Sequence, residues 1–372
     1  MNIVIDKFAK IIKKFIELKA SDLHLRSGDF PYIRTHGLLR KFEEFNFITK
    51  EEIKEFIDYI LSEEQKKRFL EEKECDIGYD FEGLARLRMN IFYQRGSINI
   101  AIRYIPKEIP AKQELNLPEA VYKLADNVRG LVLVTGPAGS GKSTTLASMI
   151  DHINSTRSAH IVTIEDPIEF VHENKNSIIS QREVLYDTKS FISALRNVVR
   201  QNPDVILIGE MRDLETIQTA LTAAQLGHFV LSTLHTVDAI QTVHRIIDIF
   251  PPHQQNQIRF QLADTLKGVI AQRLVKRKDK VGLIPIVEIL VVTPAIKKCI
   301  QENKLGDILD LMKQGKFYGM QTFNQTLVEY VKKDLIYLED ALLAATSPEE
   351  LMLAIKGIES SSLGTPQIFE RF

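Results

Sequence analysis

Cysteine is scarce in this chain of 372 residues, and the scarcity excludes several kinds of protein. The two cysteines, Cys75 and Cys299, are 224 positions apart. They cannot form a disulfide framework or a zinc module of the CxxC…CxxC type within the chain. A reducing cytosol is the simplest compartment for such a sequence, so we expect a cytoplasmic protein.

An excess of charge of one sign is also missing. Lys and Arg number 48 and Asp and Glu number 49, which gives a formal net charge of −1. Proteins that bind the phosphate backbone of DNA usually carry a basic excess. The sequence also shows no stripe of aromatic and basic residues of the kind that binds single strands. We therefore predict that the protein has no nucleic-acid partner.

Long apolar runs are absent as well. The longest stretch without Asp, Glu, Lys or Arg spans residues 216–237, and it contains glutamine, histidine and several threonines. A membrane-spanning helix needs ~20 predominantly apolar residues, so this stretch is too polar and instead predicts a buried helix followed by a buried strand. The start, MNIVIDKFAKIIKKFIEL, is charged throughout and does not resemble a signal peptide. We expect no direct insertion into a membrane.

The first part of the chain has the pattern of a small domain. The length predicts two or three domains, and 44% hydrophobic with 26% charged residues is typical of a soluble globular protein. Within 1–105 we predict an amphipathic helix over 1–20, a hairpin around 27–29, a charged helical stretch over 49–73 and alternating strands over 75–105. Thr49 and Glu52 are predicted to form a capping box at the start of the helical stretch. Three prolines mark a linker over 106–120.

After residue 128 the pattern changes. Short apolar runs at 131–134, 161–164, 205–208 and 229–231 alternate with helical segments. This alternation predicts βαβ units and a parallel sheet buried on both faces, in a core that covers 121–290. The basic run 276–280 is predicted to be the turn of a hairpin. From 291 to 372 the chain is predicted to be helical, with a loose tail at 360–366.

Eight contiguous residues in this core match a phosphate-binding loop. The sequence GPAGSGKS fits GxxxxGK[ST] and lies between a predicted strand and a predicted helix. The glycines let the backbone wrap a polyphosphate, and the helix N-terminus favours its negative charge. Lys142 is expected to reach the β- and γ-phosphates, and the Ser143 hydroxyl to bind Mg²⁺. The predicted nucleotide-binding residues are Gly136, Pro137, Ala138, Gly139, Ser140, Gly141, Lys142, Ser143 and Thr144.

Acidic residues follow two of the predicted strands. Glu210 ends the run from Asp204, and the segment 163–170 contains Glu165, Asp166 and Glu169. Ligands of parallel sheets bind at the carboxyl ends of the strands. We predict that Glu169 or Glu210 activates the attacking water as general base, a choice that stays open. Metal ligands are predicted to be Ser143, Glu165, Asp166 and Glu210.

Histidines bracket one strand of the core, and arginines gather in the first domain. His228 and His235 flank a six-residue run, and their odd spacing disfavours a shared metal. The more specific hypothesis for His235 is that it senses the γ-phosphate. The alternative for both histidines is a structural role in which they form hydrogen bonds. Multimeric P-loop motors use arginines that reach a neighbour's γ-phosphate, so the arginines of the first domain are candidates for that role.

Five blocks of sequence together resemble the secretion ATPase superfamily of type II and type IV systems, over roughly residues 20–300. They are ASDLHL (20–25), GPAGSGKSTT (136–145), TIEDPIEF (163–170), LRNVVRQNPDVILIGEMRD (195–213) and TALTAAQLGHFVLSTLHT (219–236). Within it the chain is most similar to the pilus retraction ATPases of twitching motility. We expect the protein to have neither the long N-terminal extension nor the tetracysteine zinc insert of many assembly and secretion members. Residues 295–302, AIKKCIQE, are similar to that family's late AIRNLIRE helix, although both arginines are replaced.

The resemblance implies a fold, an activity and partners. The fold would be α/β, with a PAS-like N-terminal domain, a RecA-like P-loop NTPase core and C-terminal helices. The activity would be that of a hexameric, ATP- and Mg²⁺-dependent motor that powers type IV pilus retraction. Its partners would be the pilus machinery and an inner-membrane platform protein, reached from the cytoplasmic face of that membrane.

The resemblance also implies residue roles. Residues 136–143 would be the Walker A motif, 204–210 the Walker B block and 165–169 the Asp box, with Glu169 the favoured base. His228 and His235 would form a His box, and Arg88 and Arg103 would reach the nucleotide. The alternatives are a pilus-assembly or type II secretion ATPase, a RecA-like nucleic-acid motor and a non-hydrolysing nucleotide-switched scaffold.

Overall fold

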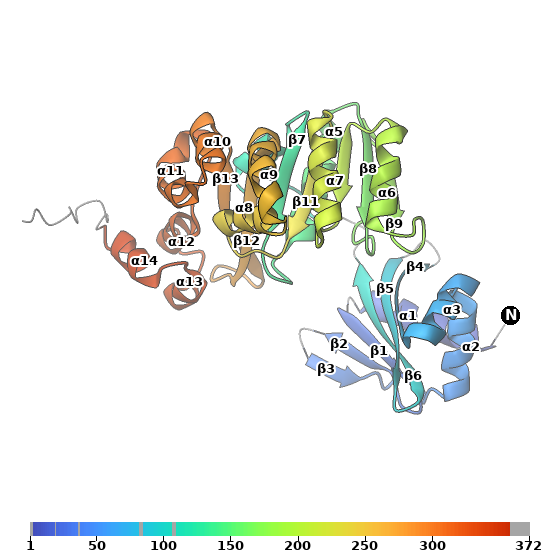
Figure 1. Cartoon of the computed structure of the whole chain (residues 1–372). Helices are drawn as coiled ribbons and strands as arrows, with labels where there is room; N and C mark the ends of the chain where they lie inside the picture. The colour runs from blue at the N-terminus through green and yellow to red at the C-terminus, as the bar shows by residue number, and fades with distance from the viewer. Residues whose placement is uncertain (1–2, 19, 36–37, 82–84, 106–108, 358–372) are drawn as a thin grey trace, which may run out of the picture. The chain divides into compact units, whose positions relative to one another are not determined.

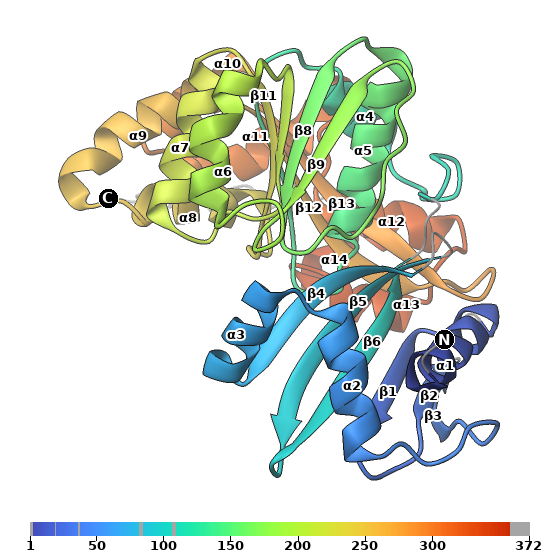
Figure 2. The same cartoon turned by 90° about the vertical axis from the view of Figure 1, so that its right-hand side faces the viewer.

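The computed structural model describes residues 3–18, 20–35, 38–81, 85–105 and 109–357, which form two compact units (Figures 1 and 2). One unit comprises Met1–Glu108 with Pro167–Val171, and the other comprises Ile109–Asp166 with His172–Phe372. The predicted 106–120 linker begins outside the described residues and continues as irregular chain to residue 118. We call the two parts the N-terminal unit and the core unit.

The N-terminal unit is a six-stranded antiparallel sheet with the strand order β3-β2-β1-β6-β5-β4. Side chains alternate between its faces, so Leu23 and Leu25 pack with the helices while His24 lies on the opposite face. The predicted hairpin around 27–29 is confirmed by the pairing of β1 with β2. The elements are α1 (Ile3–Glu17), β1 (Asp22–Arg26), β2 (Tyr32–Thr35), β3 (Leu38–Lys41), α2 (Lys50–Ile60), α3 (Glu63–Glu72), β4 (Glu74–Phe81), β5 (Ala85–Gln94) and β6 (Ser97–Ile105).

The stretch 49–73, predicted to be helical, consists of the two helices α2 and α3. The capping box at Thr49 is confirmed, because the Thr49 N–H donates to Glu52 at 2.8 Å and the Glu52 N–H donates to Thr49 Oγ1 at 3.2 Å. A second capping box, formed by Ser62 and Gln65, starts α3. Leu61, the C-cap of α2, has extended backbone angles that end the first helix, and the extended Ser62 is the N-cap of the second. The sequence analysis did not identify this second helix start, because charged residues occupy the segment on both sides of Ser62.

The core unit is built on a seven-stranded sheet with the order β13-β12-β7-β11-β10-β8-β9. All neighbouring strands are parallel except β13, which pairs antiparallel with β12. The predicted hairpin around 276–280 is thereby confirmed. The elements up to the last strand are α4 (Glu119–Ala125), β7 (Gly130–Thr135), α5 (Lys142–Thr156), β8 (His160–Glu165), β9 (Ile178–Glu183), α6 (Phe191–Val198), η1 (Val199–Gln201), β10 (Val205–Ile208), α7 (Leu214–Gln225), β11 (Phe229–Leu234), α8 (Ala239–Asp248), α9 (Pro252–Thr265), β12 (Leu266–Lys276) and β13 (Leu283–Val291).

Helices cover both faces of this sheet, as the continuous apolar runs predicted. Alternate residues of β7 enter different clusters: Leu131 and Leu133 pack with α6 to α9, whereas Val132 and Val134 pack with α4 and α5. Figure 2 shows these two helical layers on opposite sides of the strands. The predicted α/β fold with a P-loop NTPase core is confirmed.

The chain after β13 is helical, as predicted, and none of the described helices is long and apolar enough to cross a bilayer. Its helices α12 to α14 pack on the β12–β13 end of the sheet. The predicted loose tail at 360–366 lies outside the described residues. The elements are α10 (Pro294–Gln301), η2 (Leu305–Asp307), α11 (Ile308–Gln314), η3 (Gly315–Tyr318), α12 (Phe323–Lys332), α13 (Leu338–Ala344) and α14 (Pro348–Ile355).

Candidate nucleotide site

The loop between β7 and α5 needs glycine at positions where the backbone and its surroundings admit no side chain. Gly136 has φ +144, and a Cβ there would lie 2.3 Å from the backbone oxygen of Gln272. Gly141 has φ +87, and its Cβ would lie 2.7 Å from Gln272 Nε2. Only glycine combines these φ values with such close contacts. The loop is therefore held tightly against β12.

Lys142 folds back over this loop. Its Nζ donates to the backbone oxygens of Gly136 at 2.8 Å and Pro137 at 2.9 Å, and the side chain is 9% exposed. The ammonium thus lies inside the loop, at the N-terminus of the 15-residue helix α5. A lysine and a helix N-terminus at one place favour a bound anion. Ser140 Oγ is also buried there and has no partner in the part of the chain that the structure describes.

Gln272 supports the loop, and the sequence analysis did not find it. In the register of β12 with β7, Ala271 pairs with Thr135, which puts Gln272 beside Gly136. Its Oε1 accepts a 2.7 Å hydrogen bond from Thr145 Oγ1 in the first turn of α5. The two residues are 127 positions apart in the chain, so no local motif could have joined them.

A pocket of 530 Å³ opens beside the loop. The loop residues 137–140 form one wall, and residues of β12, β13 and α13 form the rest. Arg273 lies in this lining, with its guanidinium 3.9 Å from the centre of the Phe323 ring, and it donates a hydrogen bond to the backbone oxygen of Ala344. The pocket is open and has an apolar rim at Leu283 and Leu343. Its volume and this rim suit a nucleoside.

Glu210 and His235 meet at the carboxyl edge of the sheet. They follow β10 and β11, and His235 Nε2 lies 3.5 Å from Glu210 Oε2. Arg212 also pairs with Glu210, whose side chain is only 14% exposed. A 2.7 Å bond from Thr233 Oγ1 to the Gly209 oxygen joins the two strand ends. Because β11 lies between β7 and β10, this pair is on the same edge as the phosphate loop.

Glu165 ends β8 at this edge, where its Oε1 accepts from Thr163 Oγ1 at 2.6 Å and from Gln181 Nε2 at 3.2 Å. Asp166 follows and is exposed. The predicted metal ligands do not converge: no group of three or more His, Cys, Asp or Glu able to hold a metal is found in the described ranges. Ser143, in the first turn of α5, is half-buried.

Glu169 and the two predicted arginines belong to the N-terminal unit. Arg88 lies 3.2 Å from Asp76 and 3.9 Å from Glu169, whose side chain is 45% exposed. Arg103 pairs with Asp22 at 3.2 Å. Both arginines are therefore held by carboxylates on the open face of the six-stranded sheet.

His228 is placed differently from the prediction. It precedes β11, and its backbone oxygen accepts from Gly130 at the start of β7, whereas the phosphate loop follows the end of β7. Its Nδ1 pairs with the backbone oxygen of Pro203 at 2.8 Å. His228 and His235 therefore lie at opposite ends of β11. The length of a strand separates them, and the structural role weighed for His228 fits its contacts.

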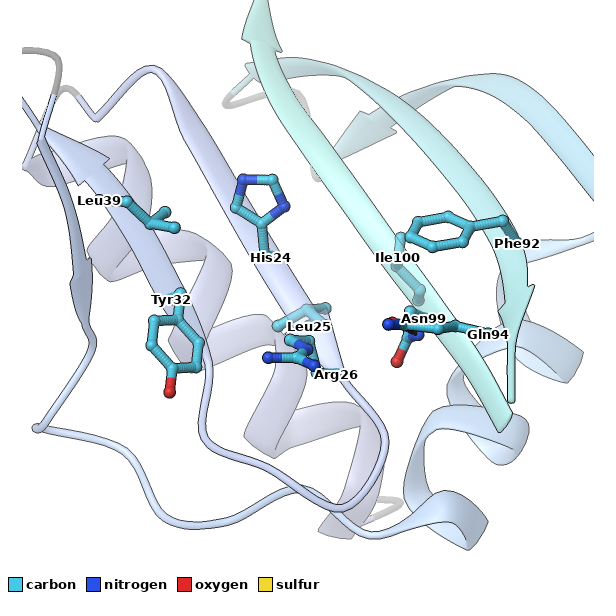
Figure 3. A pocket seen from close by; sticks show the side chains of 9 residues that line it. All are labelled: His24, Leu25, Arg26, Tyr32, Leu39, Phe92, Gln94, Asn99 and Ile100. Carbon is cyan, nitrogen blue, oxygen red and sulfur yellow. Dashed lines mark hydrogen bonds between the residues drawn. The ribbon is translucent and has the colours of Figure 1, made fainter. Parts of the chain in front are cut away.

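The open face of the N-terminal sheet carries a separate pocket of 280 Å³ (Figure 3). His24 of the ASDLHL block points into it from β1, between Leu39 and Ile100. Burial lowers the pKa of His24, and its Nε2 has no hydrogen-bond partner within the described ranges. None of the predicted nucleotide residues lines this pocket, so it is not part of the phosphate site.

Comparisons with known proteins agree with this geometry. The family model described as "Type II/IV secretion system protein" matches residues 99–341. The type IV pilus retraction ATPase PilT of Pseudomonas aeruginosa is 44% identical over 330 residues, which are 89% of this chain and 95% of that protein. A twitching motility protein of Neisseria gonorrhoeae is 42% identical over 340 residues, covering 90% of this chain and 91% of its own.

A solved structure extends the likeness to three dimensions. The crystal structure of the pilus retraction motor PilT with bound ADP superposes with a TM-score of 0.87, at 48% identity, over 93% of this chain and 99% of that one. By contrast, the type II secretion system protein E of Xanthomonas campestris matches over only 157 residues, or 26% of its length. The chain therefore belongs to the type II/IV secretion system protein family, and it is a nucleotide-binding P-loop ATPase.

Proposed function

We propose that this ATPase is a hexameric motor that hydrolyses ATP to power retraction of a type IV pilus. The observation that carries the proposal is the similarity to the PilT retraction ATPase along 95% of that protein, phosphate loop included. It works at the cytoplasmic face of the inner membrane, on the pilus machinery and a platform protein embedded there.

The phosphate loop binds the nucleotide in this proposal. The backbone N–H groups of 136–144 surround the phosphates, and Lys142 exchanges its bonds to the loop oxygens for bonds to the β- and γ-phosphates. The pocket beside the loop, with Arg273 in its wall, receives the nucleoside. Because Lys142 is already inside the loop, the exchange needs a rotation of its side chain and no refolding.

Magnesium fits the donor set at this edge. Ser143 supplies a hydroxyl, and Glu210, Glu165 and Asp166 supply carboxylate oxygens, the hard ligands that Mg²⁺ prefers. Mg²⁺ in such sites is held mainly by phosphates and waters with one or two protein groups, so a convergent protein cluster is not required. When bound, the ion neutralises charge that develops on the phosphates.

Glu210 is the general base that the core unit offers, and Glu169 is the alternative. Glu210 is mostly enclosed and contacts Arg212 and His235, which suits a group that must hold a water in one place. Glu169 is more exposed and lies near Arg88. The matched variants Glu210→Gln and Glu169→Gln decide between them in a single-turnover assay. The substitution of the base abolishes phosphate release but leaves ATP binding intact.

His235 and the two arginines complete the proposed machinery. His235 senses the γ-phosphate from the end of β11, next to the phosphate-loop strand. Arg88 and Arg103 leave their carboxylate partners to reach the γ-phosphate of a neighbouring subunit, as arginine fingers do. Hydrolysis then releases these contacts and moves the N-terminal unit about the 106–120 linker.

Two experiments test the function. Lys142→Ala should abolish ATP hydrolysis by the purified protein, with the exposed Lys316→Ala as the matched control that keeps wild-type turnover. Cells that lack the protein should be hyperpiliated and unable to twitch. Bald cells would instead favour pilus assembly or secretion, a function that the short match to secretion protein E supports only weakly.

A further inference from the structure

Glu288 is a buried carboxylate that the proposed chemistry does not use. It lies on β13, two strands away from the phosphate-loop strand, and is 5% exposed. A carboxylate is rarely buried to this extent unless specific partners hold it. Its partners therefore indicate what it does.

Those partners are the first residues of two helices. Glu288 Oε1 accepts a 2.9 Å hydrogen bond from the Ala239 N–H, the first residue of α8. The carboxylate also accepts from the N–H of Phe323, the first residue of α12. Both N–H groups are donors that the helices themselves leave unsatisfied, and the positive ends of both helix dipoles favour an anion. One side chain thus joins α8 to α12.

Helix α8 is in turn tied to the catalytic edge. It starts directly after the loop 235–238, whose first residue is His235 and whose last, Asp238, caps the helix by accepting from Gln241 N at 2.7 Å. In the first turn, Thr242 Oγ1 contacts Thr236 Oγ1 at 2.7 Å and Thr135 Oγ1 at 3.5 Å. Thr135 is the residue before the phosphate loop. The start of α8 therefore connects the 235–238 loop, which carries His235, to the residue before the phosphate loop.

The other end of the connection reaches the C-terminal helices. Phe323, at the start of α12, stacks under Arg273, which also donates to Ala344 of α13 and lines the pocket beside the loop. Burial and the nearby Asp238 raise the pKa of Glu288, the two backbone N–H groups and Arg273 lower it, and the net result is a pKa of about 7. These are the charged groups that face the carboxylate from α8 and β12.

We propose that Glu288 is a positioning residue that holds His235 at the γ-phosphate end of the site by anchoring α8 to α12. This inference rests on the proposed role of His235. It assigns Glu288 no contact with the substrate. Through Phe323 and Arg273, the same anchor connects the state of the γ-phosphate to the C-terminal helices.

Glutamine is the informative replacement because it keeps the size of the side chain. Its amide has one oxygen that can accept, and the other end is an NH₂ donor facing an N–H donor. Glu288→Gln also removes the negative charge that the positive ends of both helices favour, so it weakens the joint anchor of the two helices. The fold is retained, but α8 and α12 are held less firmly by this group.

The test is a double-mutant cycle with His235 in the full-length protein. Glu288→Gln should lower kcat for ATP by on the order of tenfold, while KM changes less than about twofold because the phosphate loop is untouched. In the His235→Ala background the same substitution should have no further effect on kcat. Thr293→Ala, which removes the cap of α10, is the control that lowers the melting temperature but keeps kcat.

Each outcome decides a different question. Multiplicative effects of Glu288→Gln and His235→Ala, or wild-type kcat in the folded Glu288→Gln protein, would overturn the positioning role alone. Wild-type kcat in His235→Ala would overturn the proposed sensor and this inference with it. If Glu288→Gln does not fold, Thr242→Val interrupts the same connection on the α8 side. It should then show the same loss of kcat and the same non-additivity with His235→Ala, and additivity would again refute the proposal.

Discussion

Two glycines of the phosphate loop allow the contribution of local packing to be separated from that of backbone conformation. Gly136 and Gly139 both have positive φ, +144 and +76, so an alanine is strained at either position. A Cβ at Gly139 meets nothing within 4 Å, whereas one at Gly136 lies 2.3 Å from the Gln272 oxygen and 2.6 Å from Ser140 Oγ. The pair differs mainly in what the new methyl group touches.

The magnitudes follow from these contacts. Gly139→Ala should cost about 1–2 kcal/mol in unfolding free energy, the usual cost of a left-handed conformation with a side chain. Gly136→Ala bears a similar cost and in addition must push the loop away from the backbone of β12, because a carbonyl oxygen cannot rotate aside. Overpacking of this kind costs roughly 1–3 kcal/mol more. We expect Gly136→Ala to be less stable than Gly139→Ala by about 2 kcal/mol.

The assay is thermal unfolding of the nucleotide-free proteins, followed by titration with a fluorescent ATP analogue. For a unit of this size, about 2 kcal/mol corresponds to a difference of roughly 4–8 °C in Tm. Gly136→Ala should also bind ATP at least about 100-fold more weakly, which corresponds to roughly 3 kcal/mol. Equal Tm values for the two variants would show that the loop does not press on β12, and the argument from the Gln272 contact would then be refuted.

Three further perturbations address the supporting residues. Glu288→Gln should flatten the pH dependence of stability. Because the pKa of Glu288 is raised from 4.5 to about 7 in the folded chain, the wild-type protein should lose ~3 kcal/mol of unfolding free energy as pH rises between these values. Urea unfolding of both proteins at pH 5 and pH 7.5 measures the difference. Gln272→Leu should cost about 1–3 kcal/mol because the buried Thr145 hydroxyl loses its acceptor, whereas Gln272→Leu combined with Thr145→Val should recover part of the loss in the same unfolding assay. Arg103→Ala should be inactive alone but regain ATPase activity when mixed with Lys142→Ala subunits, which supply an intact arginine to the neighbouring site; no recovery in mixed assemblies would contradict a role across subunits.

The phosphate loop could be predicted because all its determinants are contiguous. Eight residues carry the glycines and the lysine, and the strand before and the helix after them are visible as local patterns. The structure adds the reason for two of the glycines, which is Gln272 of β12: its backbone oxygen lies against Gly136 and its side-chain Nε2 against Gly141. That reason depends on a residue more than a hundred positions away, so the motif alone could not reveal it.

The histidines show where sequence reasoning reached its limit. His228 and His235 share one short block and were predicted as one His box. The direction of β11 puts them at opposite edges of the sheet, ~20 Å apart for a six-residue strand. Gln272 and Glu288 were missed for the converse reason. They follow no motif, and their partners are brought to them by strand pairing and helix packing.

The sequence by itself determined the alternation of strands and helices, the capping box at Thr49, the phosphate loop and the family resemblance. Each depends on backbone angles and hydrogen bonds among residues that are near one another in the chain. Only the tertiary structure decided the strand order β13-β12-β7-β11-β10-β8-β9, and with it which strand ends meet. That order results from burying apolar faces against helices on both sides of the sheet, a condition on the whole chain. It places Glu210 beside His235, Gln272 under the loop and Glu288 between two helices.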